Sequence, residues 1–442
     1  MHCVVAGAGY VGVTTALVLV EKGHTVLLVD IDEARAHRIA NAEMPFIEPG
    51  CDAALKSARA SGRLSTGTDL AAACASTDVV FVCVGTPSRP NGDADLSFVK
   101  DAAKMVGQGF RRANAEPLVV MKSTVPPGTT RELLVPEIER ASRKKDGQGF
   151  HGLSNPEFLR EGKALEDSRN PDRLVVGASN PHAADRLVQL WGYPGVPTVR
   201  TDPTTAEFIK YAANAFLATK VSFANEMANL SSRVGVDVYD VMHGIGLDRR
   251  IGEAFLRAGA GFGGSCFPKD VRALERFAKK QGVPLRIPRA VLEINEAQPK
   301  EVVDLADRAL GGLSGKSVAL LGLAFKPDTD DVRETRALPI YDELVARGAK
   351  VTCWDPAALS NFKRLVNGKN LVATTDLREA LRGKDVAILQ TEWPQLRELP
   401  AAEWKTLMRH ALVVDGRRAA DGPALEAAGV RYHAIGGKNP TS

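Results

Sequence analysis

Short apolar segments alternate with longer amphipathic segments along most of the chain, a pattern typical of α/β proteins. In the first half we predict a helix over 13–22 and strands at His2–Ala6, Thr25–Val29, 78–84 and Leu118–Met121. These strands are nearly continuous apolar or β-branched runs, as expected of parallel strands that are buried on both faces. The first half therefore predicts a doubly wound sheet.

The second half of the chain repeats this pattern. Strands are predicted at Ser317–Leu321, Lys350–Trp354, Val386–Leu389 and 411–414. A Thr-Asp-Leu sequence also recurs: Thr68 precedes the strand starting at Asp78 by the same spacing as Thr375 precedes the strand starting at Asp385. The repeat predicts a second Rossmann-like domain.

Between the two halves, residues 203–235 contain no proline or glycine except at their ends and are rich in Ala, Leu, Glu and Lys. They predict one helix of roughly 45 Å, long enough to join two domains and apolar enough to form a dimer interface. The predicted fold class is α/β: two Rossmann-like doubly wound domains joined by a long central helix. We expect the first Rossmann-like domain over 1–200, a central helical domain over 201–300 and the second Rossmann-like domain over 311–442.

Composition narrows the class of protein. The 442 residues are 44% hydrophobic and 25% charged, and the net charge of +4 is spread along the sequence, which argues against nucleic acid as the main partner. The six cysteines form no CxxC pair and have no histidine at ligand spacing, so we expect neither a disulfide framework nor a metal site. No uncharged stretch is long enough to span a membrane, and the apolar start lacks a preceding basic residue. A cytoplasmic protein is expected.

A glycine-rich turn directly follows the first predicted strand. Gly7, Gly9 and Gly12 occupy the positions of a dinucleotide fingerprint, in which the first glycine makes the turn, the second admits the pyrophosphate and the third packs helix against strand. Asp30, at the end of the next strand, would accept hydrogen bonds from the ribose hydroxyls. An acidic residue there favours NAD over NADP, whereas the nearby Arg35 is the one feature that would suit the additional phosphate of NADP. Thr86, Ser123 and Thr124 follow two further strands, where ligands of doubly wound sheets bind.

Three further motifs contain candidate chemistry, each with a structural alternative. Cys266 follows a glycine turn and precedes Lys269 and Asp270, an arrangement that suits a nucleophile but also an ordinary buried cysteine. Lys210 and Asn214 lie four residues apart on the central helix, where they could stabilise an oxyanion or simply form a surface hydrogen bond. The third motif is residues 154–162. There, Asn155 as N-cap and Pro156 as first helical residue predict a helix with Glu157 and Glu161 on one face, as functional carboxylates or as a solvated acidic turn.

The second predicted Rossmann-like domain lacks the complete fingerprint, since only Gly322 remains. We therefore expect it not to bind a dinucleotide in the same way. It instead offers cations at or near strand ends that would suit a diphosphate, or form surface salt bridges: Lys326, Arg333, Arg336, Arg417 and Arg418.

Taken in order, these motifs resemble those of the UDP-glucose/GDP-mannose dehydrogenase family over nearly the whole chain. The matching stretches are 7–12, 85–87, 122–128, 155–162, Lys210 with Asn214, 255–270 and 322–334. Ser265 before the cysteine and Lys269 after it differ from the enzymes that act on N-acetylmannosamine nucleotides. The surroundings of the cysteine are similar to those of GDP-mannose dehydrogenases, whereas 250–259 is closer to UDP-glucose enzymes.

The resemblance implies oxidation of a sugar C6 alcohol to a carboxylate with two NAD and one water, giving a uronic acid. An aldehyde held on Cys266 as a thiohemiacetal could give a second hydride and leave a thioester for hydrolysis. Asp270 and Thr124 would take the hydroxyl proton through a water, while Lys210 and Asn214 would stabilise the oxyanions. Glu157 is the candidate for activating the hydrolytic water, and the sequence leaves open how this role is divided between Glu157 and Asp270.

The resemblance also implies two sets of ligand contacts. The expected NAD contacts are Gly7, Gly9, Tyr10, Val11, Gly12, Asp30, Arg35, Thr86, Thr124, Glu161, Lys269 and Arg333. The expected UDP-sugar contacts are Glu157, Phe158, Leu159, Arg160, Glu161, Lys210, Asn214, Phe255, Leu256, Arg257, Ala258, Gly259, Gly263 and Lys326, with Arg250 reaching the ligand of a neighbouring subunit.

Two other functions fit part of the sequence. A two-electron NAD dehydrogenase with a merely buried Cys266 would form one NADH per substrate. A non-catalytic nucleotide-sugar sensor would keep the pockets and lose the chemistry, but all six candidate catalytic residues are present. The prediction is therefore a UDP-glucose 6-dehydrogenase that is at least a homodimer, with GDP-mannose or another nucleotide sugar as the alternative substrate.

Overall fold

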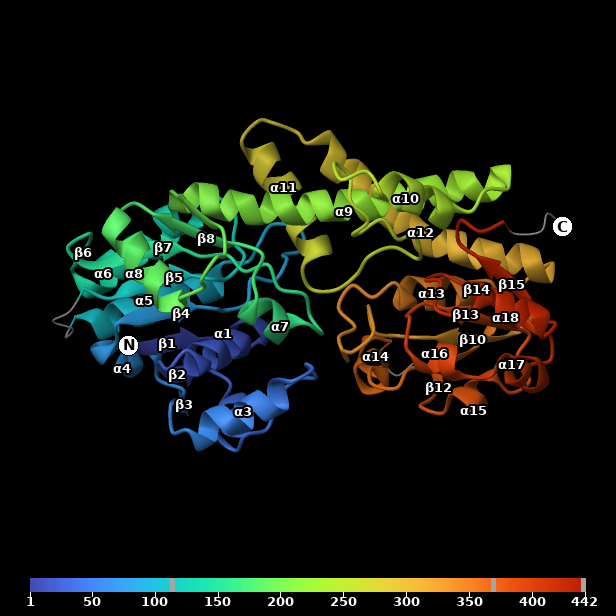
Figure 1. Cartoon of the computed structure of the whole chain (residues 1–442), viewed down its shortest axis with the longest axis horizontal. Coiled ribbons are helices and arrows are strands. Elements are labelled where there is room, and N and C mark those ends of the chain that lie inside the picture. The colour runs from blue at the N-terminus through green and yellow to red at the C-terminus, as the bar shows by residue number, and fades with distance from the viewer. Residues whose placement is uncertain (112–115, 367–370, 439–442) are drawn as a thin grey trace. The chain divides into compact units, whose positions relative to one another are not determined.

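The computed structural model describes residues 1–111, 116–366 and 371–438 (Figure 1). These residues form two compact units, Met1–Ala213 and Asn214–Ser442, and the boundary falls within one long helix. Each unit contains one sheet of mainly parallel strands. The predicted α/β class with two Rossmann-like domains and a long helix is confirmed.

The sheet of the first unit has the strand order β3-β2-β1-β4-β5-β7-β8-β9, and β6 pairs with β7. Its pairs are parallel except for β7 with β8. Successive residues of β1 pack into different cores, Cys3 and Val5 into one and Val4 and Ala6 into the other, which explains the continuous apolar run. The strands are β1 (His2–Ala6), β2 (Thr25–Val29), β3 (Leu64–Gly67), β4 (Val79–Val82), β5 (Leu118–Met121), β6 (Lys145–Asp146), β7 (Gly149–Ser154), β8 (Leu174–Ala178) and β9 (Thr198–Thr201).

Helices cover both faces of this sheet. Buried residues of α1, α3 and α8 pack into one core and those of α5 and α6 into the other, as a doubly wound sheet requires. The elements are α1 (Tyr10–Glu21), α2 (Glu33–Ala40), α3 (Cys51–Ala60), α4 (Leu70–Ala73), α5 (Ser97–Phe110), a turn of π-helix (Thr130–Leu134) that continues into α6 (Val135–Ser142), α7 (Ala164–Arg169) and α8 (Pro181–Trp191).

The sheet of the second unit is parallel throughout, in the doubly wound order β12-β11-β10-β13-β14-β15. Three of its four predicted strands have the predicted bounds, and the fourth begins one residue later. The strands are β10 (Ser317–Leu321), β11 (Lys350–Trp354), β12 (Val372–Thr374), β13 (Val386–Leu389), β14 (Leu412–Asp415) and β15 (Arg431–Ala434). The helices around it are α13 (Ala337–Ala346), α14 (Leu359–Leu365), α15 (Leu377–Leu381), α16 (Gln395–Glu398), α17 (Ala401–Leu407) and α18 (Gly422–Ala427).

The internal repeat has a structural cause. Asp69 caps α4 by accepting a hydrogen bond from the N–H of Ala72, and Asp376 caps α15 in the same way through Arg378 and Glu379. The short Thr-Asp-Leu sequence therefore begins the equivalent helix in each unit, because an aspartate at this position satisfies helix N–H groups that lack a partner.

The long helix α9 (Pro203–Val234) is continuous over 32 residues, close to the predicted 203–235 (Figure 1). At 1.5 Å per residue it extends for about 48 Å. The second unit also contains α10 (Val238–Gly246), α11 (Phe267–Lys280) and α12 (Arg286–Leu310). The sequence between α10 and α11 is a loop whose conformation is fixed by buried polar side chains described below.

Candidate active site

The glycine turn after β1 has the geometry of a dinucleotide cradle. A Cβ atom on Gly12 would lie 1.8 Å from the carbonyl oxygen of Gly7, so α1 approaches the turn too closely for any side chain. A Cβ on Gly9 would meet nothing within 4 Å, which leaves open space at the N-terminus of α1. Gly9 caps this helix without a side-chain hydrogen bond, so the helix N–H groups can receive a pyrophosphate.

Asp30 follows β2 and is buried. Its carboxylate accepts hydrogen bonds from the N–H of Ala8 at 2.6 Å and from the N–H of Asp32 at 2.9 Å. Arg35, whose guanidinium would suit an additional phosphate, contacts the carboxylates of Asp30 and Asp32. These contacts link the glycine turn to the acidic residue expected at the ribose, and they engage Arg35 with acidic side chains.

Side chains after β4 and β5 connect the ends of these two strands. The hydroxyl group of Thr86 donates to the carbonyl oxygen of Thr124 at 2.8 Å. Ser123 donates to the carbonyl of Val84 at 2.7 Å. Thr124 is thus fixed through its backbone, and its hydroxyl belongs to a half-buried side chain at the carboxyl edge of the sheet.

The prediction of a helix starting at Pro156 is wrong. Residues 155–160 have no regular structure, and the next helix is α7, which begins at Ala164. The physical reason is that Asn155 is buried and does not act as an N-cap. Its side-chain oxygen accepts from Lys122 at 3.1 Å and from Trp191 at 3.0 Å, and its amide donates to the carbonyl of Val175.

The buried pair Glu157–Lys210 is the central charged feature of the first unit. The Nζ of Lys210 lies 3.0 Å from the Oε1 of Glu157, and the N–H of Leu159 donates to Oε2 at 2.5 Å. Burial alone would raise the pKa of Glu157, but the Lys210 ammonium and the N–H of Leu159 hold that pKa below its ordinary value. The ring of Phe158 lies near both Lys210 and Arg173.

The remaining residues of this segment are held by carboxylates from elsewhere. Arg160 pairs with Asp167 at 2.6 Å. Glu48 is buried and accepts from the N–H groups of Gly162 and Ala164, each at 2.7 Å, so it caps α7. Glu161 is half-buried in this loop. The sequence did not single out Glu48, because it lies more than 110 residues from the backbone that it caps.

In the second unit, Cys266 lies at the N-terminus of α11, where the helix dipole favours negative charge. Of the six cysteines, all of which lie in described residues, the other five are buried and Cys266 is half-buried. Asp270 follows one turn later and is buried. Its carboxylate accepts from the Nδ2 of Asn214 at 2.7 Å and from the Nζ of Lys269 at 2.6 Å. Four of the predicted residues therefore form one cluster.

The loop before Cys266 is held by two buried amides that sequence reasoning missed. Asn295 of α12 accepts from the N–H of Phe262 at 2.7 Å and donates to its carbonyl at 3.0 Å. Asn225 of α9 accepts from the N–H of Gly259 at 2.8 Å. No local spacing in the sequence could reveal them, because each lies more than 30 residues from the backbone that it binds.

The same loop contains several of the expected sugar-contact residues. Phe255 adopts a positive φ of 66°, and its ring lies 5.9 Å from that of Phe267. Leu256 and Ala258 are buried, whereas Arg257 is exposed. A Cβ on Gly259 would lie 2.3 Å from the carbonyl of Gly416, and one on Gly263 would lie 2.4 Å from that of Glu334. The two glycines are needed because other backbone segments pass close to them.

The predicted cations of the second unit all contact other groups of the protein. Arg336, Arg417 and Arg418 contact protein groups: Arg336 the carbonyl of Glu334, Arg417 those of Gln390 and Gly261, and Arg418 the carboxylate of Asp237. They therefore stabilise loops of the unit. Lys326 lies near the ring of Phe325, Arg333 pairs with Asp331, and Arg250 is highly exposed beside Asp248.

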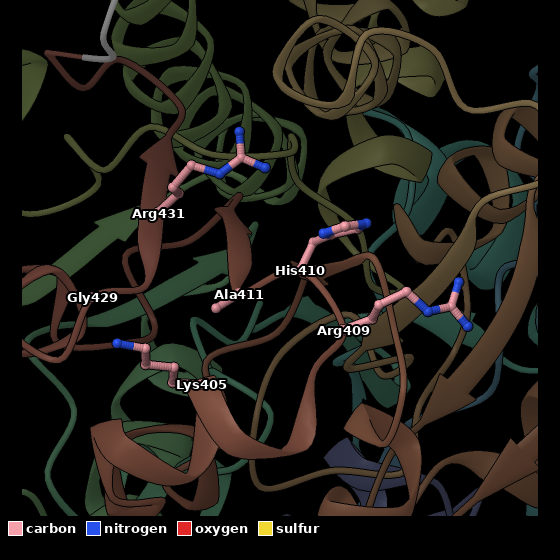
Figure 2. Close-up of a pocket in the computed structure, with 6 residues that line it drawn as sticks. All are labelled: Lys405, Arg409, His410, Ala411, Gly429 and Arg431. Atoms are coloured by element: carbon pink, nitrogen blue, oxygen red, sulfur yellow. The ribbon is translucent and has the colours of Figure 1, made fainter.

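A cationic pocket lies at the amino-terminal edge of the second sheet, before β14 and β15. It is lined by Lys405, Arg409, His410, Ala411, Gly429 and Arg431 (Figure 2). Figure 2 shows the side chain of Lys405 extending away from those of Arg409 and His410, so these groups do not converge on one point. Asp385 also pairs with Arg409. Since ligands of doubly wound sheets bind at the carboxyl edge, we assign no substrate to this pocket.

Within the described ranges, no group of three or more His, Cys, Asp or Glu side chains is arranged to hold a metal ion. The same residues include no helix that is both long and apolar enough to cross a membrane.

The comparisons with known proteins agree with this architecture. Three models of the UDP-glucose/GDP-mannose dehydrogenase family match: the NAD binding domain over 1–193, the central domain over 204–297 and the UDP binding domain over 319–422. A UDP-glucose 6-dehydrogenase from Bacillus subtilis, TuaD, is 40% identical over 98% of this chain and 92% of its own length.

Two solved structures are also similar. A UDP-glucose dehydrogenase from Pyrobaculum islandicum has 41% identity and a TM-score of 0.91, covering 99% of this chain and 98% of that one. A GDP-mannose dehydrogenase from Pseudomonas aeruginosa has 32% identity and a TM-score of 0.57, covering 98% of this chain and 100% of that one.

The dinucleotide cradle and the two doubly wound units define the class of this protein as an NAD-dependent oxidoreductase. More specifically, the chain belongs to the UDP-glucose/GDP-mannose dehydrogenase family, which confirms the resemblance and the NAD cofactor predicted from the sequence.

Proposed function

We propose that this protein oxidises UDP-glucose to UDP-glucuronate with two NAD and one water, through covalent intermediates on Cys266. The observation that carries the proposal is the position of Cys266, a half-buried thiol at the start of α11, one turn before a buried Asp270 that is bound by Asn214 and Lys269. A two-electron alcohol dehydrogenase needs no nucleophile at this place, whereas a cysteine that holds the aldehyde as a thiohemiacetal allows a second hydride to leave.

The proposed reaction consists of two oxidations followed by one hydrolysis. The C6 alcohol loses a proton to a water held by Asp270 and Thr124. The glycine turn after β1 would hold NAD, which would supply the hydride acceptor for both oxidations. The Cys266 thiolate then adds to the aldehyde carbon, and loss of the second hydride leaves a thioester. Addition of water breaks the carbon–sulfur bond and releases the carboxylate and the thiolate. In total, one alcohol, one water and two NAD give one carboxylate, two NADH and three protons.

The charged groups of both units suit their proposed parts in this reaction. Lys210 and Asn214, four residues apart on α9, stabilise the developing oxyanions. Glu157 is ionised beside Lys210, because its pKa is lowered, and can therefore accept a proton from the hydrolytic water. For NAD and the UDP-sugar we propose the contact residues that the family resemblance implies.

UDP-glucose is preferred over GDP-mannose as the substrate. The two similar solved structures are, by name, a UDP-glucose dehydrogenase and a GDP-mannose dehydrogenase. The UDP-glucose dehydrogenase has the higher sequence identity to this chain and the higher TM-score. A cytoplasmic location and a homodimer or higher homo-oligomer, with no nucleic-acid or membrane partner, complete the proposal.

The first test is the amount of NADH formed at completion with limiting UDP-glucose and, separately, limiting GDP-mannose. We expect two NADH per UDP-glucose in the native enzyme and loss of that reaction in Cys266→Ala. Ser265→Ala is the matched control, because it removes the hydroxyl 3.4 Å from the thiol and keeps the sulfur; it should retain two NADH per sugar. Two NADH from GDP-mannose alone would replace the proposed substrate. One NADH per sugar would refute the covalent mechanism.

A further inference from the structure

Glu207 is a buried carboxylate on α9 for which the proposed reaction has no part. Only 3% of its surface is exposed. Its Oε2 accepts from the N–H of Gly128 at 2.7 Å, and its Oε1 accepts from the N–H of Thr130 at 2.8 Å and from the Thr130 hydroxyl at 2.5 Å. All of these groups belong to the first unit.

The groups that Glu207 binds lie at the start of the helical segment that runs through the π-turn into α6. A helix N-terminus has N–H groups without intrahelical partners and attracts negative charge. Here a carboxylate of the protein fills that position. The bonds therefore attach this helix start to α9 and exclude a ligand phosphate from it.

The attached segment is the end of the loop that contains Thr124. The start of this loop is fixed by Ser123, which donates to the carbonyl groups of Val82 and Val84. Glu207 fixes the other end at Gly128, and Thr124 lies between the two attachments. Its carbonyl is bound by Thr86 in addition. The direction of the Thr124 hydroxyl therefore depends on both ends of the loop.

The same turn of α9 contains Lys210, three residues after Glu207, and Lys210 binds Glu157. One turn of helix thus contacts both the Thr124 loop and the buried carboxylate proposed for hydrolysis. The first turn of α9 is itself packed against β8, where a Cβ on Gly177 would lie 2.7 Å from the Cα of Pro203. These contacts make the turn a rigid support.

We infer that Glu207 is a positioning residue that holds the Thr124 loop against α9 at the distance from Lys210 and Glu157 that the reaction requires. This inference rests on the proposed role of Thr124. Burial raises the pKa of Glu207 to about 7, although its hydrogen bonds favour the carboxylate. A pH at least one unit above this value keeps the group ionised, with acceptors for all three donors.

Glu207→Gln is the test variant because it keeps the shape of the side chain but presents an NH₂ group to a backbone donor. At a pH at least one unit above the Glu207 pKa, we expect kcat to fall ~10-fold, since the loss of one favourable hydrogen bond is worth about a factor of ten. The KM values for NAD and for UDP-glucose should each change less than ~3-fold. Amide hydrogen exchange in peptides covering 122–134 should become ~10-fold faster. Thr130→Val, which removes one donor and no charge, should change both quantities in the same direction by less.

Glu226→Gln is the matched control, because Glu226 is an exposed glutamate on the same helix. It should leave kcat and the exchange of 122–134 unchanged. Exchange in Glu207→Gln equal to that in Glu226→Gln would overturn the inference, as would faster exchange with unaltered kcat. Failure of the native protein to oxidise UDP-glucose would instead refute the proposed function, and the exchange measurement, which needs no activity, would still decide whether Glu207 holds the loop.

Discussion

Lys122 shows how a single residue can tie the stability of the first unit to pH. Its ammonium is buried, donates to the carbonyl and side-chain oxygens of Asn155, each at 3.1 Å, and lies near the ring of Trp191. Burial lowers the pKa of Lys122 from its ordinary value of 10.5 to about 8. Between these two pH values the unfolded chain binds more protons at this residue than the folded chain does.

The free energy of unfolding should therefore rise with pH through this window, because the neutral lysine costs less to bury. We expect native protein to gain up to about 3 kcal/mol relative to Lys122→Met between pH 8 and 10.5. Thermal unfolding of both proteins across that range measures the difference. Lys56→Met, at an exposed position of α3, is the control and should show no such trend. A constant difference between native protein and Lys122→Met would contradict the prediction.

At the scale of elements, the start of α9 depends on one glycine of β8. A Cβ on Gly177 would lie 2.6 Å from the Cβ of Ala206 and 2.8 Å from the carbonyl oxygen of Asp202. Gly177→Ala must displace the first turn of α9 from the sheet, at a cost of about 1–3 kcal/mol. We expect a lower melting temperature and a reduced kcat, because Glu207 and Lys210 move with this turn.

Gly67→Ala is the matched control for that prediction. Gly67 lies in β3 of the same sheet, and its added Cβ would meet only the side chain of Leu27, at an ordinary 3.6 Å. Thermal unfolding and steady-state kinetics of the two variants should separate a clash with α9 from a general effect of replacing a strand glycine by alanine. Equal behaviour of the two variants would show that α9 tolerates the displacement.

The elements predictable from the sequence were those whose pattern is local. The strands of the second unit and the long α9 follow from continuous apolar runs and from the absence of proline and glycine. The segment after β7 was mispredicted as a helix because Asn155 and Pro156 match a helix start. Its conformation is decided by Lys122, Val175 and Trp191, which are distant in sequence.

The residues of the candidate site also divide into those related by local sequence spacing and those that act over long sequence distances. Cys266, Lys269 and Asp270 are close in sequence, and helix periodicity relates Lys210 to Asn214, so these local relations could be predicted. The hydrogen bond from Asn214 to Asp270 joins residues that are distant in sequence and could not. Glu48, Glu207 and Asn295 could not be predicted, because each acts on backbone N–H groups more than 30 residues away. Buried polar side chains that fix loops leave no periodic signal in a single sequence.

At the scale of the whole molecule, α9 presents an apolar stripe that supports the proposed homodimer. Phe216, Phe223 and Leu230 lie seven residues apart, so they share one face, and their exposed fractions are 66%, 44% and 54%. Apolar residues at this spacing on a helix surface are typical of packing against another helix. A second copy of the chain supplies an identical stripe, which a two-fold axis across α9 would bring face to face.

Leu230→Glu should therefore separate the subunits, because association would bury one carboxylate from each copy in an apolar contact without a partner. Light scattering after gel filtration should give a dimer mass, or a multiple of it, for the native protein and a lower mass for the variant. Val345→Glu adds the same charge to an exposed apolar position of α13 and should keep the native mass. A monomeric native protein would refute the homo-oligomer itself. An unchanged mass in Leu230→Glu would instead assign the contact to a surface other than this face of α9.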